Sequence, residues 1–202
     1  MRSMRKVINL AVVAGLLLSS CNTDFHNTAD AKKFMEDKDN GLRKEICVER
    51  FVYSYQYKPA AYIQATEATG DEDPAAAEQR KKNLDQMWWF NVELSVADFN
   101  QSPLRYQLTS MEEYQQRQDY MLNYAPRDFV LLAGTDTLHP ASYWFENNQN
   151  LTPSETVVLA FEKPKQMPEE VQLVFNDQLF RYGIIKATFE TKKLNKKISI
   201  TR

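Results

Sequence analysis

The sequence predicts a mainly β protein with two helices, folded as an antiparallel β-sandwich. Several short segments alternate apolar and polar residues, which is the period of a strand with one packed face. Proline, glycine and asparagine separate these segments, and only two segments carry helix-start signals. Short strands in such a succession favour a sandwich over a sheet of alternating strands and helices. With 43% hydrophobic residues, the chain has enough apolar surface to form a core.

The first predicted strand covers residues 46–57. Its odd-numbered positions carry Phe51 and three tyrosines, so this side of the strand is expected to pack against the core. Pro59 ends the strand because proline has no backbone N–H for the ladder. Cys47 lies on the same side between two aliphatic residues, so we interpret it as a buried thiol. A reactive or intermolecular cysteine is the alternative.

A surface helix followed by a second strand is expected after Asp73. Asp73 supplies an N-cap acceptor and is followed by proline, which suits the first helical position. Residues 75–84 are strong helix formers with a thin apolar face. The strand covers residues 88–96 and turns Trp88 inward. Trp89 cannot share that face, so it either packs on a helix or is exposed.

The second helix begins with a capping box over residues 110–113. Ser110 caps the first turn, and a glutamate three residues later reaches back toward the cap. We expect the helix to extend to about Leu122, before Pro126 stops it, and to bury Tyr114, Met121 and Leu122.

The last third of the chain is the clearest β region. Residues 128–133 and 137–146 are expected to form a hairpin around a turn at 134–136, with Pro140 marking an edge or a bulge. Four further strands are expected over residues 155–162, 171–175, 184–190 and 198–200.

The N-terminus has the layout of a secretory signal peptide. Arg2, Arg5 and Lys6 precede an apolar run over residues 7–18, and small residues then lead to Cys21. The run is shorter than the roughly twenty residues that cross a bilayer, which disfavours a membrane-spanning helix. It also lacks the amphipathic pattern of a helix packed on a core.

The segment Leu18-Ser19-Ser20-Cys21 resembles the lipobox of bacterial lipoprotein signals. The resemblance implies that residues 1–20 are a cleaved signal peptide and that Cys21 becomes the acylated first residue, carrying palmitate-type chains. Residues 21–41 are polar, with room for one short helix, and are expected to form a flexible lipid tether. A β-rich globular domain is then expected over residues 42–202.

The lipid at Cys21 would hold the protein to a membrane. Asn22 follows the lipidated position, where an aspartate tends to signal inner-membrane retention, so we expect an outer-membrane lipoprotein. Whether it occupies the periplasmic or the surface face stays open. The net charge of −2 provides no basic field, so nucleic acid is not an expected partner.

No catalytic or cofactor motif is recognisable, so we expect neither an enzyme nor a metal or cofactor site. A zinc site or a Ser-His-Asp triad needs histidines or clustered ligands, and the two histidines, His26 and His139, are isolated. Five scattered glycines do not form a phosphate loop. Adjacent carboxylates, such as those of residues 71–73, are expected to be solvated and lack the spacing of a calcium loop.

The last 80 residues contain five short runs of interest: Phe129-Val130-Leu131-Leu132, Gly134-Thr135-Asp136-Thr137-Leu138, Tyr143-Trp144-Phe145-Glu146, Leu151-Thr152-Pro153 and Leu159-Ala160-Phe161-Glu162. Together they resemble uncharacterised envelope lipoproteins of the Bacteroidota type. Residues 153–161 are also similar, more faintly, to telokin-like immunoglobulin-fold extracellular lipoproteins. The resemblance implies an immunoglobulin-like sandwich in the cell envelope, and it brings no catalytic residues.

The favoured function is a non-enzymatic binding or assembly module with an envelope protein or a glycan as partner. Its contact surface is predicted at Trp89, Tyr143 and Trp144, because aromatic side chains are abundant and catalytic motifs are missing. Asp136-Thr137-Leu138 is similar to a short O-glycosylation acceptor of exported proteins, which predicts modification of Thr137. Two alternatives stay open: a hydrolase whose acidic residues converge only in the fold, and a structural or glycosylated surface protein.

Overall fold

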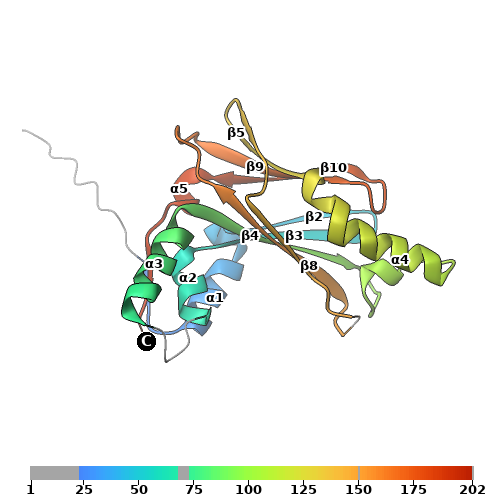
Figure 1. The fold of residues 1–202 in the computed structure, drawn as a ribbon, viewed down its shortest axis with the longest axis horizontal. Helices are drawn as coiled ribbons and strands as arrows, with labels where there is room; N and C mark the ends of the chain where they lie inside the picture. Colours follow the sequence, from blue (N-terminus) through green and yellow to red (C-terminus); the bar gives the residue numbers. More distant parts are fainter. Residues whose placement is uncertain (1–22, 68–72, 150, 202) are drawn as a thin grey trace, which may run out of the picture.

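Two antiparallel sheets pack face to face, with helices gathered at the two ends of the sandwich (Figure 1). The computed structural model describes residues 23–67, 73–149 and 151–201. This architecture confirms the predicted mainly β sandwich. The two predicted helices are present, and the described residues contain three further short α-helices.

The larger sheet has five strands in the order β2-β3-β4-β8-β7. Their bounds are Arg43–Val48 for β2, Phe51–Lys58 for β3, Met87–Val96 for β4, Ser154–Glu162 for β8 and Ser142–Glu146 for β7. The smaller sheet has the order β10-β9-β5-β6. Its strands are Gly183–Glu190 (β10), Glu170–Asp177 (β9), Phe129–Ala133 (β5) and Asp136–Leu138 (β6). A parallel pair, β1 (Thr23–Phe25) and β11 (Ile198–Ile200), lies apart from both sheets.

The helices occupy opposite ends of the molecule. Figure 1 places α1 (Thr28–Glu36), α2 (Ala60–Glu67) and α3 (Pro74–Asp85) together at one end, and α4 (Met111–Asp119) at the other. The short α5 (Thr191–Leu194) follows β10, and single turns cover Lys38–Asn40, Pro103–Arg105 and Ala125–Asp128. A π-turn over Tyr120–Tyr124 continues α4.

Large aromatic side chains fill the space between the sheets. Trp88, Phe90 and Tyr53 are fully buried, as the alternation in the sequence predicts. The Phe129 and Phe175 rings of the smaller sheet stack with centroids 4.3 Å apart. Burial of whole aromatic side chains is the main stabilising contribution in such a core.

Both predicted N-caps are present. The Asp73 carboxylate accepts a hydrogen bond from the Ala76 N–H at 3.1 Å, and the Ser110 hydroxyl accepts one from the Glu113 N–H at 3.1 Å. Glu113 completes its side of the box by accepting from the Thr109 N–H, one residue before the cap. The expected burial of Leu122 is wrong, because the π-turn leaves this side chain 50% exposed.

The predicted long strand over residues 46–57 is instead a hairpin of β2 and β3. The chain reverses at Glu49, whose φ is 54°, and Val48 pairs with Phe51. A two-residue turn changes which positions share a face: Val48 now lies on the side of Phe51, and Cys47 lies opposite. The predicted burial of Cys47 is therefore wrong, and its thiol is exposed and free.

The predicted hairpin partner over residues 137–146 is split between the two sheets. Its first part is β6, which pairs with β5 as expected. After Pro140 the chain crosses to the larger sheet, where β7 pairs with β8. A strand that changes sheets at a proline closes one corner of the sandwich.

The described part of the predicted tether, from Thr23 onward, is folded onto the domain. Ala31 and Met35 on α1 are buried, and Phe34 packs against the core between them. The Gln56 amide donates to the carbonyl of Met35, at 3.0 Å, and to that of Leu42. Three apolar residues at helical spacing are sufficient to dock this polar segment.

Candidate functional site

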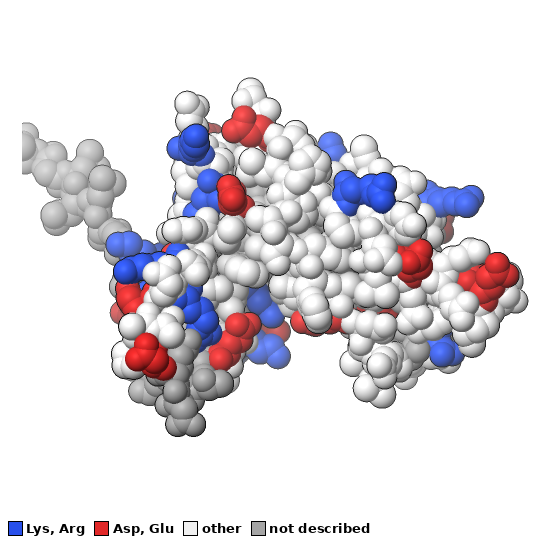
Figure 2. All heavy atoms as spheres, in the orientation of Figure 1, with Lys and Arg blue, Asp and Glu red and all other residues white. Residues whose placement is uncertain are grey.

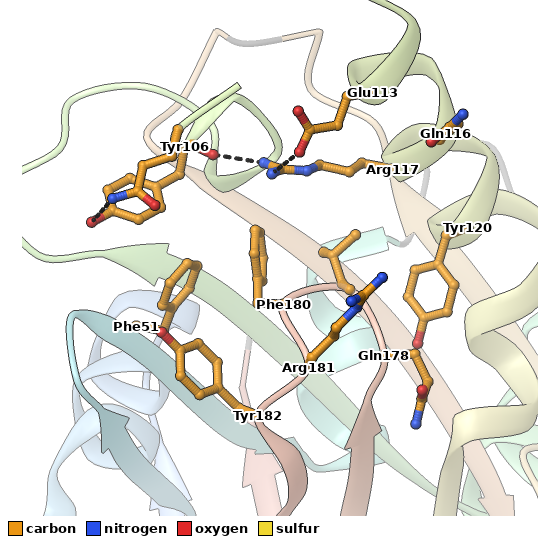
Figure 3. Close-up of a pocket in the computed structure, with 12 residues that line it drawn as sticks. Phe51, Tyr106, Glu113, Gln116, Arg117, Tyr120, Gln178, Phe180, Arg181 and Tyr182 are labelled. Atoms are coloured by element: carbon orange, nitrogen blue, oxygen red, sulfur yellow. Dashed lines mark hydrogen bonds and ion pairs between the residues drawn. The ribbon is translucent and has the colours of Figure 1, made fainter. Parts of the chain in front are cut away.

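An open groove lies at the end of the sandwich that carries α4, with a volume of about 460 Å³. Its walls are α4, the segment after Pro103–Arg105, and the loop 178–182 that connects β9 with β10 (Figure 3). This size falls within the range of ordinary ligand sites, which combine aromatic walls with a few polar groups.

Five aromatic side chains line the groove: Phe51, Tyr106, Tyr120, Phe180 and Tyr182. Phe51 is buried beneath the others, with its centroid 4.3 Å from that of Phe180 and 5.2 Å from that of Tyr182. Tyr106 meets Phe51 edge-on at 5.3 Å. The four upper rings are half-buried, so part of their surface faces solvent over a packed base.

Arg117 joins two walls of the groove. Its guanidinium donates to the backbone carbonyls of Leu104, at 3.1 Å, and Tyr106, at 2.7 Å, and it lies 5.2 Å above the ring of Phe180. It also pairs with Glu113 at 2.5 Å (Figure 3). Hydrogen bonds from Thr109 are the main reason why the pKa of Glu113 is lowered. This carboxylate is thus held ionised as a fixed partner of Arg117.

Other polar side chains of the groove are available to a ligand. Arg181 is exposed and forms no ion pair with any described residue. The amides of Gln116 and Gln178 provide further donors and acceptors along the walls, whereas the Gln107 amide donates to the Tyr106 hydroxyl at 3.4 Å. Tyr182 donates to Glu49 at 2.7 Å, which raises the pKa of this phenol to about 12 and keeps it protonated.

The buried carboxyl of Asp177 fixes the loop wall of the groove. Asp177 is 0% exposed and accepts from the backbone N–H groups of Leu179, at 2.9 Å, and Phe180, at 3.0 Å. Its other oxygen accepts from the Tyr53 hydroxyl at 2.7 Å. Burial is the largest cause of the raised pKa of Tyr53, followed by the nearby Asp177. One side chain therefore ties the loop to the core of the opposite sheet.

A second buried carboxyl holds the segment that forms the facing wall. Glu155 is 2% exposed and accepts a hydrogen bond from the fully buried Ser102 hydroxyl. The same hydroxyl accepts from the Leu104 N–H at 3.1 Å, two residues before Tyr106. Both walls are thus anchored in the core before a ligand arrives, which reduces the ordering cost of binding.

Left-handed backbone also marks both walls. Gln107 has a φ of 52° and Arg181 a φ of 62°, a region that non-glycine residues rarely occupy. Such strain persists where the surrounding structure imposes it, and it gathers at ligand sites.

Changing Glu155 to glutamine is expected to alter how stability depends on pH. Burial raises the pKa of Glu155, so the folded state binds its proton more tightly than the unfolded state. The stabilisation from the bound proton is complete below pH 4.5, the ordinary pKa of a glutamate in the unfolded chain. It is lost as the pH rises through the higher pKa of the folded state. We therefore expect Glu155→Gln to gain stability relative to the wild type between acidic and neutral pH, measured by urea unfolding.

Glu162→Gln is the matched control, because this exposed residue ends the same strand. Its stability difference from the wild type should be constant over the same pH range. If the stability difference between Glu155→Gln and the wild type is also independent of pH, the pKa of Glu155 is not raised by burial.

The three predicted contact residues do not form one surface. Trp144 is 67% exposed, on the outer face of the larger sheet. Trp89 shares that face but is half-buried, with its indole N–H donating to the Leu84 carbonyl at 3.2 Å. Tyr143 points to the inner side, packs on Phe129 and donates to the Met121 carbonyl at 2.5 Å. Tyr143 is therefore a structural residue rather than a contact residue.

The remaining predicted residues lie at scattered places. Thr137 is exposed on β6 at the edge of the smaller sheet, which is compatible with its predicted modification. Cys21 lies outside the described residues. No group of three or more potential metal ligands is present in the described part of the chain. In that same part, no helix has the length and apolar character needed to cross a membrane.

The groove was not foreseen in the sequence. The residues that form it come from positions near 51, 106, 117 and 180, and the sheet pairing alone brings them together. The capping box located α4 but gave no sign that Glu113 and Arg117 face a groove. An aromatic-arginine-aromatic run, Phe180-Arg181-Tyr182, was the one local signal in the sequence.

Comparison with protein-family models, with curated proteins and with solved structures finds no match to this chain.

Proposed function

We propose that this protein is a lipid-anchored envelope protein of the Bacteroidota type, acylated at Cys21 and held at the outer membrane. Its layout as a signal peptide with a lipobox supports this proposal. In this proposal the folded domain is a non-enzymatic binding module, and the groove at the α4 end is its ligand site.

The observation that carries the proposal is a preformed groove in which half-buried rings lie beside polar side chains, among them Arg181, Gln116 and Gln178. Rings such as those of Phe180 and Tyr182 offer apolar faces to the C–H faces of a sugar. The amides and the guanidinium of Arg181 supply hydrogen bonds to hydroxyls or carboxylates. This combination favours an extended envelope glycan over a purely apolar ligand.

Geometry argues against the alternative of a hydrolase in this groove. Acid-base hydrolysis of a glycan uses two carboxyl groups on either side of the bond that breaks. Among the described residues that line the groove, the only carboxylate is Glu113, and Arg117 and Thr109 already engage it. We therefore retain binding without catalysis as the function.

Titration calorimetry with soluble neutral and uronate-containing oligosaccharides tests the proposal. Arg181→Ala should weaken binding of the best oligosaccharide about ten- to a hundredfold, because a charge-assisted hydrogen bond contributes roughly 1.5–3 kcal/mol. Alanine has a Cβ, as arginine does, so the backbone strain at this position stays the same. The free energy of unfolding should therefore change little.

Trp144→Ala is the matched control, because this ring is exposed on a different face. It should leave the affinity unchanged. If Trp144→Ala weakens binding while Arg181→Ala does not, the ligand binds the outer sheet face and the groove is not the site.

A further inference from the structure

A second surface of interest lies at the opposite end of the sandwich from the groove. A cavity of about 490 Å³ opens between α2, α3 and the C-terminal strand β11. Four lysines line it, with Asp85 as the one carboxylate among its described residues; the lysines are Lys81, Lys163, Lys196 and Lys197. Figure 2 shows a band of lysine and arginine atoms at the end that carries α1–α3, with acidic side chains beside it.

None of these four lysines forms an ion pair with a described residue. Lys163 donates to the Asp85 carbonyl at 2.6 Å, and Lys196 lies 5.2 Å above the Phe34 ring. Lys81 and Lys197 are exposed and form no ion pair with any described residue. The cavity therefore presents excess positive charge to whatever lies against it.

The first residues that the structure describes lie beside this cavity. Thr23 pairs with Ile198, and its N–H donates to the Lys197 carbonyl at 3.1 Å. Only two residue steps separate Thr23 from Cys21 in the sequence. Two steps of extended chain span at most about 7 Å. A headgroup layer is of similar thickness, roughly 5–8 Å on each side of the hydrocarbon core.

We infer that the lysine-lined face of β11, α2 and α3 docks on the membrane and contacts anionic phospholipid headgroups. The inference depends on the proposed acylation of Cys21, which would place the β1–β11 pair at headgroup level. Phosphates at that depth would lie close to Lys197, whose carbonyl accepts from the Thr23 N–H, so their attraction to it is only partly screened. Lys81 lines the same cavity. The domain then stands upright, with its glycan groove directed away from the bilayer.

The orientation can be measured on the full mature chain, purified from membranes and mixed with vesicles of phosphatidylcholine, with or without phosphatidylglycerol. Gln64→Cys places a thiol in the lysine-lined cavity at a side chain without a described hydrogen bond. The native Cys47, exposed next to the β2–β3 turn, serves as an internal reference. Labelling of both by a water-soluble maleimide is quantified by mass spectrometry of their peptides.

We expect the thiol at position 64 to react about tenfold more slowly on the anionic vesicles than on the neutral ones, with Cys47 unchanged. Adding Lys81→Glu and Lys197→Glu should remove this protection. The charge-matched control Arg127→Glu with Lys186→Glu lies away from the cavity and should retain it.

Equal labelling rates on both vesicle types would overturn the docking, as would protection that survives in the Lys81→Glu, Lys197→Glu variant. Failure of the chain to sediment with any vesicle at high salt would instead overturn the lipid anchor, and the docking inference with it. The two failures are therefore distinguishable in one experiment.

Discussion

Replacing Asp177 by alanine is expected to lower the free energy of unfolding by about 4 kcal/mol and to abolish glycan binding. The change leaves the buried Tyr53 hydroxyl and the N–H groups of Leu179 and Phe180 without their acceptor. Each unsatisfied buried group costs roughly 1–3 kcal/mol. The loop 178–182 would lose its attachment to the core, and with it the wall that presents Phe180 and Arg181.

A graded pair of variants separates the loss of stability from the loss of the loop. Tyr53→Phe removes one hydrogen bond and keeps the loop attachment, so it should cost about 1–2 kcal/mol and spare binding. The side-chain oxygen of Asp177→Asn can still accept from the loop N–H groups. The loss of stability of this variant should therefore lie between those of Tyr53→Phe and Asp177→Ala. Urea unfolding and calorimetry on the same samples measure both effects. If Asp177→Ala binds the oligosaccharide normally, the loop does not form the site.

Replacing Cys21 by serine is expected to have an all-or-none effect on location. Each buried methylene of an acyl chain contributes about 0.8 kcal/mol to membrane binding, and more than one chain makes the anchor stable. Without the thiol there is no thioether, so the protein should move to the soluble fraction after a high-salt wash. Lysine contacts alone are screened under that condition.

Cys47→Ser is the matched control for that experiment. Cys47 is exposed and free, on a strand far along the chain from the lipobox. Its replacement should leave the protein in the membrane fraction. Retention of the Cys21→Ser protein in washed membranes would show that something other than lipid holds it.

Local patterns in the sequence predicted the strands well where one face is buried. Alternation located β4, β8, β9 and β10 to within a few residues, because a half-buried strand has to repeat every second position. The caps at Asp73 and Ser110 located α3 and α4 for a similarly local reason.

The errors occurred where a long-range contact decided between local alternatives. Nothing in the run from Arg43 to Lys58 marks the reversal at Glu49, because neither turn residue is glycine or asparagine. The polar segment from Thr23 onward is folded because Phe34 and Met35 pack against the core of the domain. The local composition of the segment does not reveal this contact. Pro140 signalled an irregularity, but the switch of sheets depends on the pairing of β7 with β8.

The groove was harder to predict than the fold, because its residues are adjacent only in space. Strands β5 to β9 lie between Tyr106 and Tyr182 in the sequence. Neither tyrosine has a local sequence pattern that distinguishes it from other aromatic residues near a loop. Asp177 and Glu155, which anchor the walls, look like surface acids until their burial is known.

The mass of the N-terminal peptide of the mature, membrane-bound protein tests most directly whether this domain is anchored by lipid. We predict a first residue at position 21 whose cysteine carries a diacylglyceryl thioether and whose preceding twenty residues are gone. An unmodified Cys21, or peptides from residues 1–20 in the membrane-bound protein, would contradict the lipid anchor.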